Sequence, residues 1–116
     1  MYEGTVAFLI KRNFGETFFL AGSYQNLDRA MDKDWTFSRT FVDFIKLDRA
    51  VRKKYPDLKK LPPKPYLVGE EASFMPFQAY LESLLSIPGA FEDASVYEFL
   101  ACPADVITAG AACVFF

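Results

Sequence analysis

The chain has 116 residues, of which 52% are apolar and 17% aromatic, and it carries a net charge of −2. This composition excludes a disordered tail and suffices for one domain with a single core. The absence of histidine removes the commonest general base near neutral pH, along with histidine-dependent catalytic and zinc sites. No glycine-rich phosphate loop follows a predicted strand. We therefore expect a protein that is not an enzyme and that uses no metal or cofactor.

The sequence also bears on the compartment in which the chain works. It contains no run of about 18 apolar residues, and Met1–Gly4 lacks the basic start of a secretory signal. Cys102 and Cys113 have neither a metal-binding nor a redox spacing, so we expect free thiols. These features predict a soluble, cytoplasmic protein.

Three strands are predicted in the first part of the chain. Thr5–Ile10 and Thr17–Leu20 are short apolar runs separated by a predicted turn at 13–15, and Asp34–Phe41 alternates aromatic and polar residues. Short connections favour an antiparallel meander, and Gly22 suggests a bulge in the second strand. Because side chains alternate along a strand, Trp35, Phe37 and Arg39 are expected on one face.

Helices are predicted in the rest of the chain. From Val42 to Tyr55 apolar residues recur every three or four positions with cations between them, and Pro56 ends this amphipathic helix. Residues 61–65 form a stiff proline-rich loop, and Pro76 begins a second helix. A third helix is expected near 92–100, and the apolar segment after Pro103 is not assigned. Strands followed by helices predict an α+β domain.

Charge is distributed unevenly along the chain. All thirteen lysines and arginines lie at or before Lys64, where the net charge is +5, and the remainder carries seven acidic residues. Eight cations fall between Lys46 and Lys64, which one helix and loop would display together as an anion-binding surface. A solvated helix face would show the same spacing. Nucleic-acid binding is not expected, because the pI is near 5.1 and the second part of the chain is acidic.

The order of these features resembles the phox-homology (PX) domain family, whose members mostly bind phosphoinositides. The parts that carry the resemblance are the strands, an arginine-aromatic junction at residues 39–41, the basic helix, the proline-rich loop and a helix containing Ala-Tyr-Leu-Glu-Ser-Leu-Leu at 79–85. The resemblance implies a PX-like domain over residues 1–104, with an unassigned apolar tail at 105–116. It also implies a module, similar to sorting nexins, that recruits a larger protein or assembly to the cytosolic face of membranes such as endosomes.

The resemblance also implies which residues meet the lipid head group. In that family an arginine directly before the junction aromatic binds a phosphate, the aromatic packs on the inositol ring, and a loop lysine meets another phosphate. By position, the aromatic is Phe41 and the loop lysine is Lys64. Thr40 occupies the arginine position, with Arg39 one place earlier, and Ser73 stands where a second arginine is usual. Each lost charged contact costs about 1.5 to 3 kcal/mol. The expected site is therefore a non-standard pocket built on Arg39, Phe41 and Lys64.

Three interpretations of this departure remain open. A bulge at the end of the third strand would bring Arg39 into the pocket. Alternatively, a supporting basic surface would bind anionic lipid diffusely, each cation contributing about 1 kcal/mol. That surface comprises Lys53, Lys54, Lys59 and Lys60. The third interpretation is a PX fold that has lost its lipid specificity and acts as a protein-protein interaction scaffold.

The proline-rich loop and the residues after it suggest further contacts. Tyr66, Leu67 and Val68 form a candidate membrane-insertion loop, since apolar residues beside cations suit a bilayer, although they would equally suit a protein groove. Pro62 and Pro65 have the spacing of a polyproline ligand for a Src-homology 3 (SH3) domain.

Overall fold

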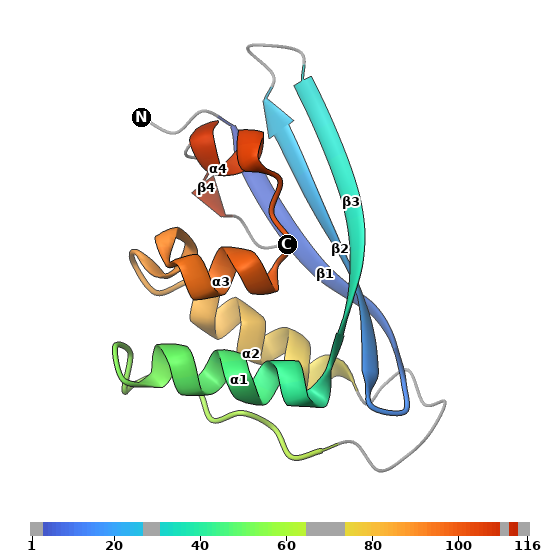
Figure 1. The fold of residues 1–116 in the computed structure, drawn as a ribbon, viewed down its shortest axis with the longest axis vertical. Helices are drawn as coiled ribbons and strands as arrows, with labels where there is room; N and C mark the ends of the chain where they lie inside the picture. The colour runs from blue at the N-terminus through green and yellow to red at the C-terminus, as the bar shows by residue number, and fades with distance from the viewer. Residues whose placement is uncertain (1–3, 27–30, 65–73, 110–111, 114–116) are drawn as a thin grey trace.

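The computed structural model describes residues 4–26, 31–64, 74–109 and 112–113. They form a curved, mainly antiparallel sheet with helices packed against one of its faces (Figure 1). The sheet order is β3-β2-β1-β4, with β1 at Thr5–Phe14, β2 at Thr17–Asn26, β3 at Met31–Thr40 and β4 at Ala112–Cys113. The helices are α1 (Phe41–Arg52), α2 (Met75–Leu85), the short 3-10 helix η3 (Ala90–Glu92), α3 (Ala94–Phe99) and α4 (Ala104–Ala109). The predicted α+β class, a three-stranded antiparallel meander followed by helices, is confirmed.

The core lies between the sheet and the helices. Alternation along the strands directs Val6 and Ile10 of β1 and Phe18 of β2 to the helical side, where all three are buried. Phe44 of α1 and Phe77 of α2 meet the Phe18 ring with centroid distances of 5.0 and 4.5 Å. Tilted and edge-on contacts of this kind are the favoured arrangements of aromatic pairs. One aromatic cluster therefore holds both helices against the sheet.

The first two strands are longer than the pattern predicts. β1 reaches Phe14 and β2 reaches Asn26, whereas their predicted ends are Ile10 and Leu20. Asn13 accounts for the extension at the hairpin, because its side-chain amide donates hydrogen bonds to two carbonyl groups of the following turn and strand. Asparagine is common in turns, but here Asn13 closes the hairpin from a position within β1.

The predicted bulge at Gly22 is wrong. Gly22 pairs without interruption with Phe8 on one side and Trp35 on the other, and the register instead shifts between Ile10 and Arg12 of β1. Glycine is required here because a Cβ atom would lie only 2.4 Å from Cζ2 of Trp35. The missing side chain leaves room for the indole ring to cross the sheet, rather than relaxing the backbone.

The edge of β1 that faces away from β2 is closed in two ways. β4 pairs in parallel with β1 at Thr5 and Val6. Farther along, Gln78 of α2 donates a hydrogen bond from Nε2 to the Phe8 carbonyl (3.3 Å) and accepts one at Oε1 from the Ile10 amide (2.7 Å). A residue in a parallel strand bonds to its neighbour in the same way. The side-chain amide therefore continues the parallel pairing where β4 has ended.

Helix α1 begins at a capping box. Thr40 Oγ1 accepts from the Asp43 amide (3.3 Å), and the Asp43 carboxylate accepts from the Thr40 amide (2.7 Å), which satisfies two backbone donors. The predicted apolar period is present, with Phe44, Leu47 and Val51 buried. The helix ends at Arg52, three residues before the predicted end, because the last turn tightens.

The C-terminal part differs most from expectation. The predicted helix at 92–100 is divided into η3 and α3, because Asp93 takes an extended conformation and caps α3. The segment that the sequence left unassigned contributes α4, whose Val106 is fully buried, and the short strand β4. The described part of this segment therefore packs with the rest of the fold. None of the helices in the described ranges is both long and apolar enough to cross a bilayer.

Asp93 gives the stability of this region a pH dependence. Its carboxylate, only 7% exposed, pairs with Nζ of Lys54 at 2.6 Å and accepts from the Ser95 amide. The bond from Lys54, with a contribution from the Ser95 amide, lowers the pKa of Asp93 below its ordinary value of 3.8. A carboxylate with a lowered pKa stabilises the fold above its ordinary pKa, and this contribution is lost as the pH falls through the lowered value.

We therefore expect Asp93→Asn to destabilise the fold at pH 7 and to matter progressively less as the pH falls below about 4. Asparagine can still cap the helix, so the change isolates the charge. Urea unfolding at several pH values measures the difference between the variant and the natural chain. Asp57→Asn, at an exposed position, is the control. A destabilisation by Asp93→Asn that is the same at pH 3 and pH 7 would contradict the expectation.

Candidate functional site

The junction of β3 and α1 carries the first predicted site residue, Phe41. Its backbone amide donates a 2.9 Å hydrogen bond to the carbonyl of Glu16 in the β1–β2 turn, which ties the start of α1 to the hairpin. The half-buried Phe41 ring packs edge-on against Phe77, with centroids 6.0 Å apart. The neighbouring Thr40 hydroxyl is occupied in the capping box of α1. The junction is thus held from three sides.

Lys64 reaches the same turn from the proline-rich loop. Its ammonium group forms an ion pair with the carboxylate of Glu16, and both side chains are about half exposed. Glu16 thus contacts Phe41 through its backbone and Lys64 through its side chain, so the structure brings these two predicted residues together. The carboxylate partly neutralises the lysine that would meet a phosphate.

Arg39 points elsewhere, as its place on the aromatic face of β3 predicts. Its Nε donates to the Phe99 carbonyl at 2.7 Å and its Nη2 to the Glu98 carbonyl at 3.1 Å, so the guanidinium caps the C-terminal end of α3. It also stacks near the rings of Phe37 and Phe99, 5.1 and 5.6 Å from their centroids. β3 pairs with β2 without a register shift up to Thr40, so no bulge redirects Arg39 toward Lys64.

A shallow hollow of about 310 Å³ lies beside Arg39, between α1 and α3. Its charged lining consists of two cations, Arg39 and Lys46, and two acids, Asp43 and Glu98. A site for a multiply charged phosphate group requires an excess of cations and of donors free to bind. The mixed lining and the engaged guanidinium do not provide this, and the hollow is not an anion pocket in this conformation.

One group of cations that have no counter-ion among the described residues lies along α1. Lys46, Arg49 and Lys53 are spaced three and four residues apart, so they share one side of the helix, and all three are exposed. None of them forms an ion pair with a residue in the described ranges. We call these three residues the α1 stripe. Lys54, predicted to belong to the same surface, is instead paired with Asp93 of α3.

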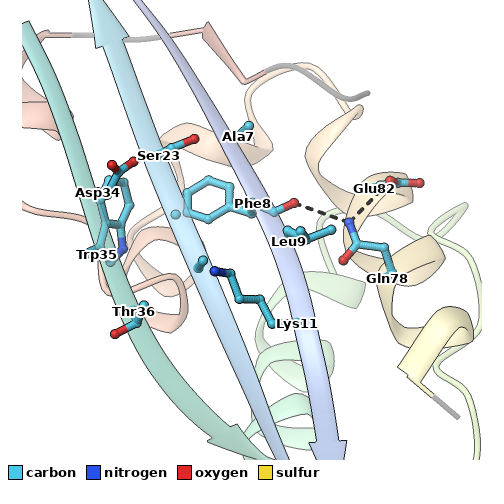
Figure 2. Close-up of a pocket in the computed structure, with 12 residues that line it drawn as sticks. Ala7, Phe8, Leu9, Lys11, Ser23, Asp34, Trp35, Thr36, Gln78 and Glu82 are labelled. Carbon is cyan, nitrogen blue, oxygen red and sulfur yellow. Dashed lines mark hydrogen bonds between the residues drawn. The ribbon is translucent and has the colours of Figure 1, made fainter. Parts of the chain in front are cut away.

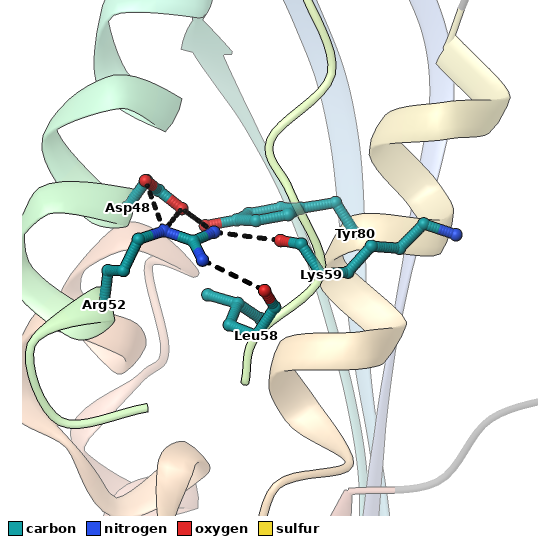
Figure 3. Close-up of polar contacts among 5 residues, drawn as sticks. All are labelled: Asp48, Arg52, Leu58, Lys59 and Tyr80. Carbon is teal, nitrogen blue, oxygen red and sulfur yellow. Dashed lines mark hydrogen bonds and ion pairs between the residues drawn. The ribbon is translucent and has the colours of Figure 1, made fainter. Parts of the chain in front are cut away.

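The segment after α1 carries the other supporting cations, Lys59 and Lys60, and both are exposed. A polar network fixes this segment to the two long helices (Figure 3). Arg52 donates to the Asp48 carboxylate within its own helix, at 2.8 Å for the shortest contact, and to the carbonyls of Leu58 and Lys59. The Lys59 side chain extends away from the network (Figure 3).

Tyr80 of α2 completes this network. Its fully buried hydroxyl donates a 2.8 Å hydrogen bond to Asp48. Burial acts to raise the pKa of Asp48, but hydrogen bonds from Arg52 and Tyr80 outweigh it, and the pKa lies below its usual value. Burial and the nearby carboxylate raise the pKa of Tyr80. The carboxylate therefore stays charged near neutral pH and holds α1, α2 and the loop together.

Several predicted residues lie outside the described ranges. These are Pro65, the candidate insertion residues Tyr66, Leu67 and Val68, and Ser73 at the usual position of a second arginine. Within the described part of the proline-rich loop, Pro62 is half-buried and Pro63 is exposed.

The sheet, the basic helix after it and the loop held beside that helix define the class of this protein. The chain matches the family model of the PX domain over residues 29–103, and because this is more than half of its length, the protein belongs to the PX domain family. Domains of this family are generally binding modules, not enzymes, which attach to phosphoinositides and recruit proteins to membranes from the cytosol. The curated proteins contain no match to the chain.

Proposed function

We propose that this PX domain binds phosphoinositide or another anionic lipid through a non-standard site and recruits a larger protein or assembly to membranes. The main contact is the α1 stripe together with Lys59 and Lys60. Phe41 and Lys64 are the nearest head-group candidates, and Arg39 joins them only if it leaves α3. The expected location is the cytosolic face of a membrane, with endosomes as the first compartment to examine.

The observation that supports this proposal is the contrast between engaged and unengaged cations. Arg39 and Lys64 already have partners within the protein, so a lipid phosphate must compete with them. The stripe residues Lys46, Arg49 and Lys53 are exposed and have no counter-ion in the described ranges. Each cation near an anionic membrane contributes about 1 kcal/mol. The three stripe residues with Lys59 and Lys60 would together contribute about 5 kcal/mol without a stereospecific pocket.

Vesicle binding tests the proposal. Changing Lys46, Arg49 and Lys53 together to glutamine is expected to weaken binding to anionic vesicles about a hundredfold, because three contributions of about 1 kcal/mol are lost. Binding should also weaken as salt is raised. The control is Lys33→Gln with Lys54→Gln, which removes two cations that already have counter-ions. Flotation with phosphatidylserine vesicles and with a phosphoinositide panel measures the effect.

A Lys64→Ala variant separates the stripe from a head-group pocket. We expect a small loss in this variant, because Lys64 must first leave Glu16 to meet a phosphate. Selective binding to one phosphoinositide that is abolished by Lys64→Ala and insensitive to the stripe changes would contradict the proposal and favour a pocket at Phe41.

The second candidate function is a protein-protein interaction scaffold. The observation that favours it is the same engagement of Arg39 and Lys64 inside the fold, which leaves the family's usual phosphate site without free cations. An SH3 domain at the Pro62 to Pro65 loop is one partner that such a scaffold would use. Failure of the natural chain to bind every lipid in the panel would favour this function.

A further inference from the structure

The face of the sheet opposite the helices, which we call the outer face, combines a hollow with exposed apolar side chains. The hollow has a volume of about 540 Å³, and its lining includes three small residues of β1 and β2, Ala7, Ala21 and Ser23. Figure 2 shows Ala7 and Ser23 among the lining side chains. Three of the large apolar side chains that stand exposed in the described ranges lie on this face, namely Leu9 (54% exposed), Phe14 (62%) and Phe19 (36%). The outer face therefore presents exposed apolar side chains next to a hollow.

Charges are placed at opposite corners of the outer face. Lys11 and Arg12 are exposed on β1, near the β1–β2 turn. Asp32 and Asp34 are exposed on β3, at the other end of the sheet and across β2 from the cations. None of these four residues is ion-paired within the described ranges. The strands of this face thus carry two cations and two acids, separated along its diagonal, and a further acid, Glu82 of α2, lines the hollow at the β1 edge.

We propose that the outer face is the contact surface between two copies of this chain. A two-fold axis requires one patch to be complementary to itself. A two-fold axis above the centre of the hollow, parallel to the sheet and perpendicular to the diagonal, brings Lys11 and Arg12 of each copy opposite Asp34 and Asp32 of the other. The same operation places Leu9 of one copy over the small lining residues of the other. A single two-fold arrangement therefore gives both electrostatic and shape complementarity between the two copies.

A second copy suits this face better than an anionic membrane does. A face whose acids at least equal its cations has no net attraction for a negatively charged surface. In a two-fold complex, however, the cationic end of one copy would lie against the acidic end of the other. Association by strand addition at β1 is blocked between Phe8 and Ile10, because Gln78 already bonds to that edge. The other edge strand, β3, pairs with β2 alone, but association at that edge would leave the hollow and the charges of the outer face unused.

The dimer goes beyond the proposed lipid binding and leaves its surface free. The α1 stripe belongs to a helix on the opposite side of the sheet (Figure 1). Each copy in the dimer would therefore keep its own stripe exposed for lipid. Dimerisation can nevertheless be measured without lipid, so its failure is distinguishable from a failure of the lipid proposal.

Sedimentation equilibrium of the whole chain, from about 1 µM to about 1 mM, tests the dimer by charge reversal. Lys11→Glu and Asp34→Lys are each expected to weaken dimerisation at least about tenfold, because each places like charges opposite one another twice in the complex. The variant that carries both changes should dimerise like the natural chain, since the pair is restored with opposite signs. Lys53→Glu on α1 is the control and should leave dimerisation unchanged.

Melting temperatures of the four variants show whether each remains folded. A natural chain that stays monomeric over the whole concentration range would overturn the proposal. So would a dimer that responds equally to Lys53→Glu, or a double variant no better than the single changes, since the charges would then not face each other. Leu9→Glu gives an independent check, because a dimer that persists with a charge in the hollow does not use this face.

Discussion

Replacing Gly22 with alanine is expected to lower the free energy of unfolding by about 2 to 4 kcal/mol. The new Cβ atom would lie 2.4 Å from Cζ2 and 2.5 Å from Cε2 of Trp35. The indole cannot turn aside cheaply, because its Nε1 donates to the Leu100 carbonyl at 3.0 Å and its ring packs edge-on against Phe8. Overpacking of this kind costs about 1 to 3 kcal/mol, and a lost hydrogen bond adds about 1 kcal/mol.

Urea unfolding followed by far-ultraviolet circular dichroism measures this effect, because Trp35 is the chain's single tryptophan and a fluorescence signal would be lost in variants that lack it. Trp35→Phe removes both atoms that the methyl group would strike, so Gly22→Ala should cost less in the Trp35→Phe background than in the natural chain. Ser23→Ala, next to Gly22 but on the outer face, serves as the control. Equal losses in both backgrounds would show that the cost arises from the backbone and not from the indole.

The second large effect is expected at Arg52. Changing Arg52 to alanine removes its bonds to Asp48 and leaves the Leu58 and Lys59 carbonyls without this donor, so we expect a loss of about 2 to 3 kcal/mol. The Arg52 side chain is 35% exposed, so the expected loss of stability is smaller than for a fully buried ion pair. The segment that follows α1 should also become easier to open.

Limited digestion with trypsin reports that opening, since the protease cuts after lysine and Lys59 and Lys60 lie in the segment. Arg52→Ala should be cut there sooner than the natural chain under conditions in which both remain folded. Arg52→Lys is the matched control, because it retains the charge but not the planar fork that reaches two carbonyls, and an intermediate rate is expected. Unchanged cleavage in Arg52→Ala would mean that other contacts hold the segment.

Local patterns predicted the main elements because those elements are decided by neighbouring residues. The period of Phe44, Leu47 and Val51 identified α1, and alternation placed Arg39 on the aromatic face of β3. The elements that were missed depend on distant partners. β4 is a strand only because it lies beside β1, and no pattern within two residues could reveal that.

The same distinction explains the outcome for the candidate site. The sequence identified the cations of α1 and the loop, and their exposure follows from the helix period. It could not show which cations are already paired, because Lys54 meets Asp93 and Lys64 meets Glu16 across long stretches of chain. Matching sequence motifs cannot reveal that the Glu16 carboxylate lies next to Lys64. The distribution of free charge was therefore the property that only the folded structure could supply.

Closure of the β1 edge by Gln78 links the aggregation behaviour of this domain to one helix. The edge at Phe8 and Ile10 is protected by a side chain, so the protection lasts only while α2 is docked. Any partial unfolding that detaches α2 exposes unpaired backbone groups next to the apolar residues of β1, which is a template for pairing between molecules. Conditions that loosen α2 before the sheet melts should therefore precipitate the protein, whereas complete unfolding in denaturant should remain reversible.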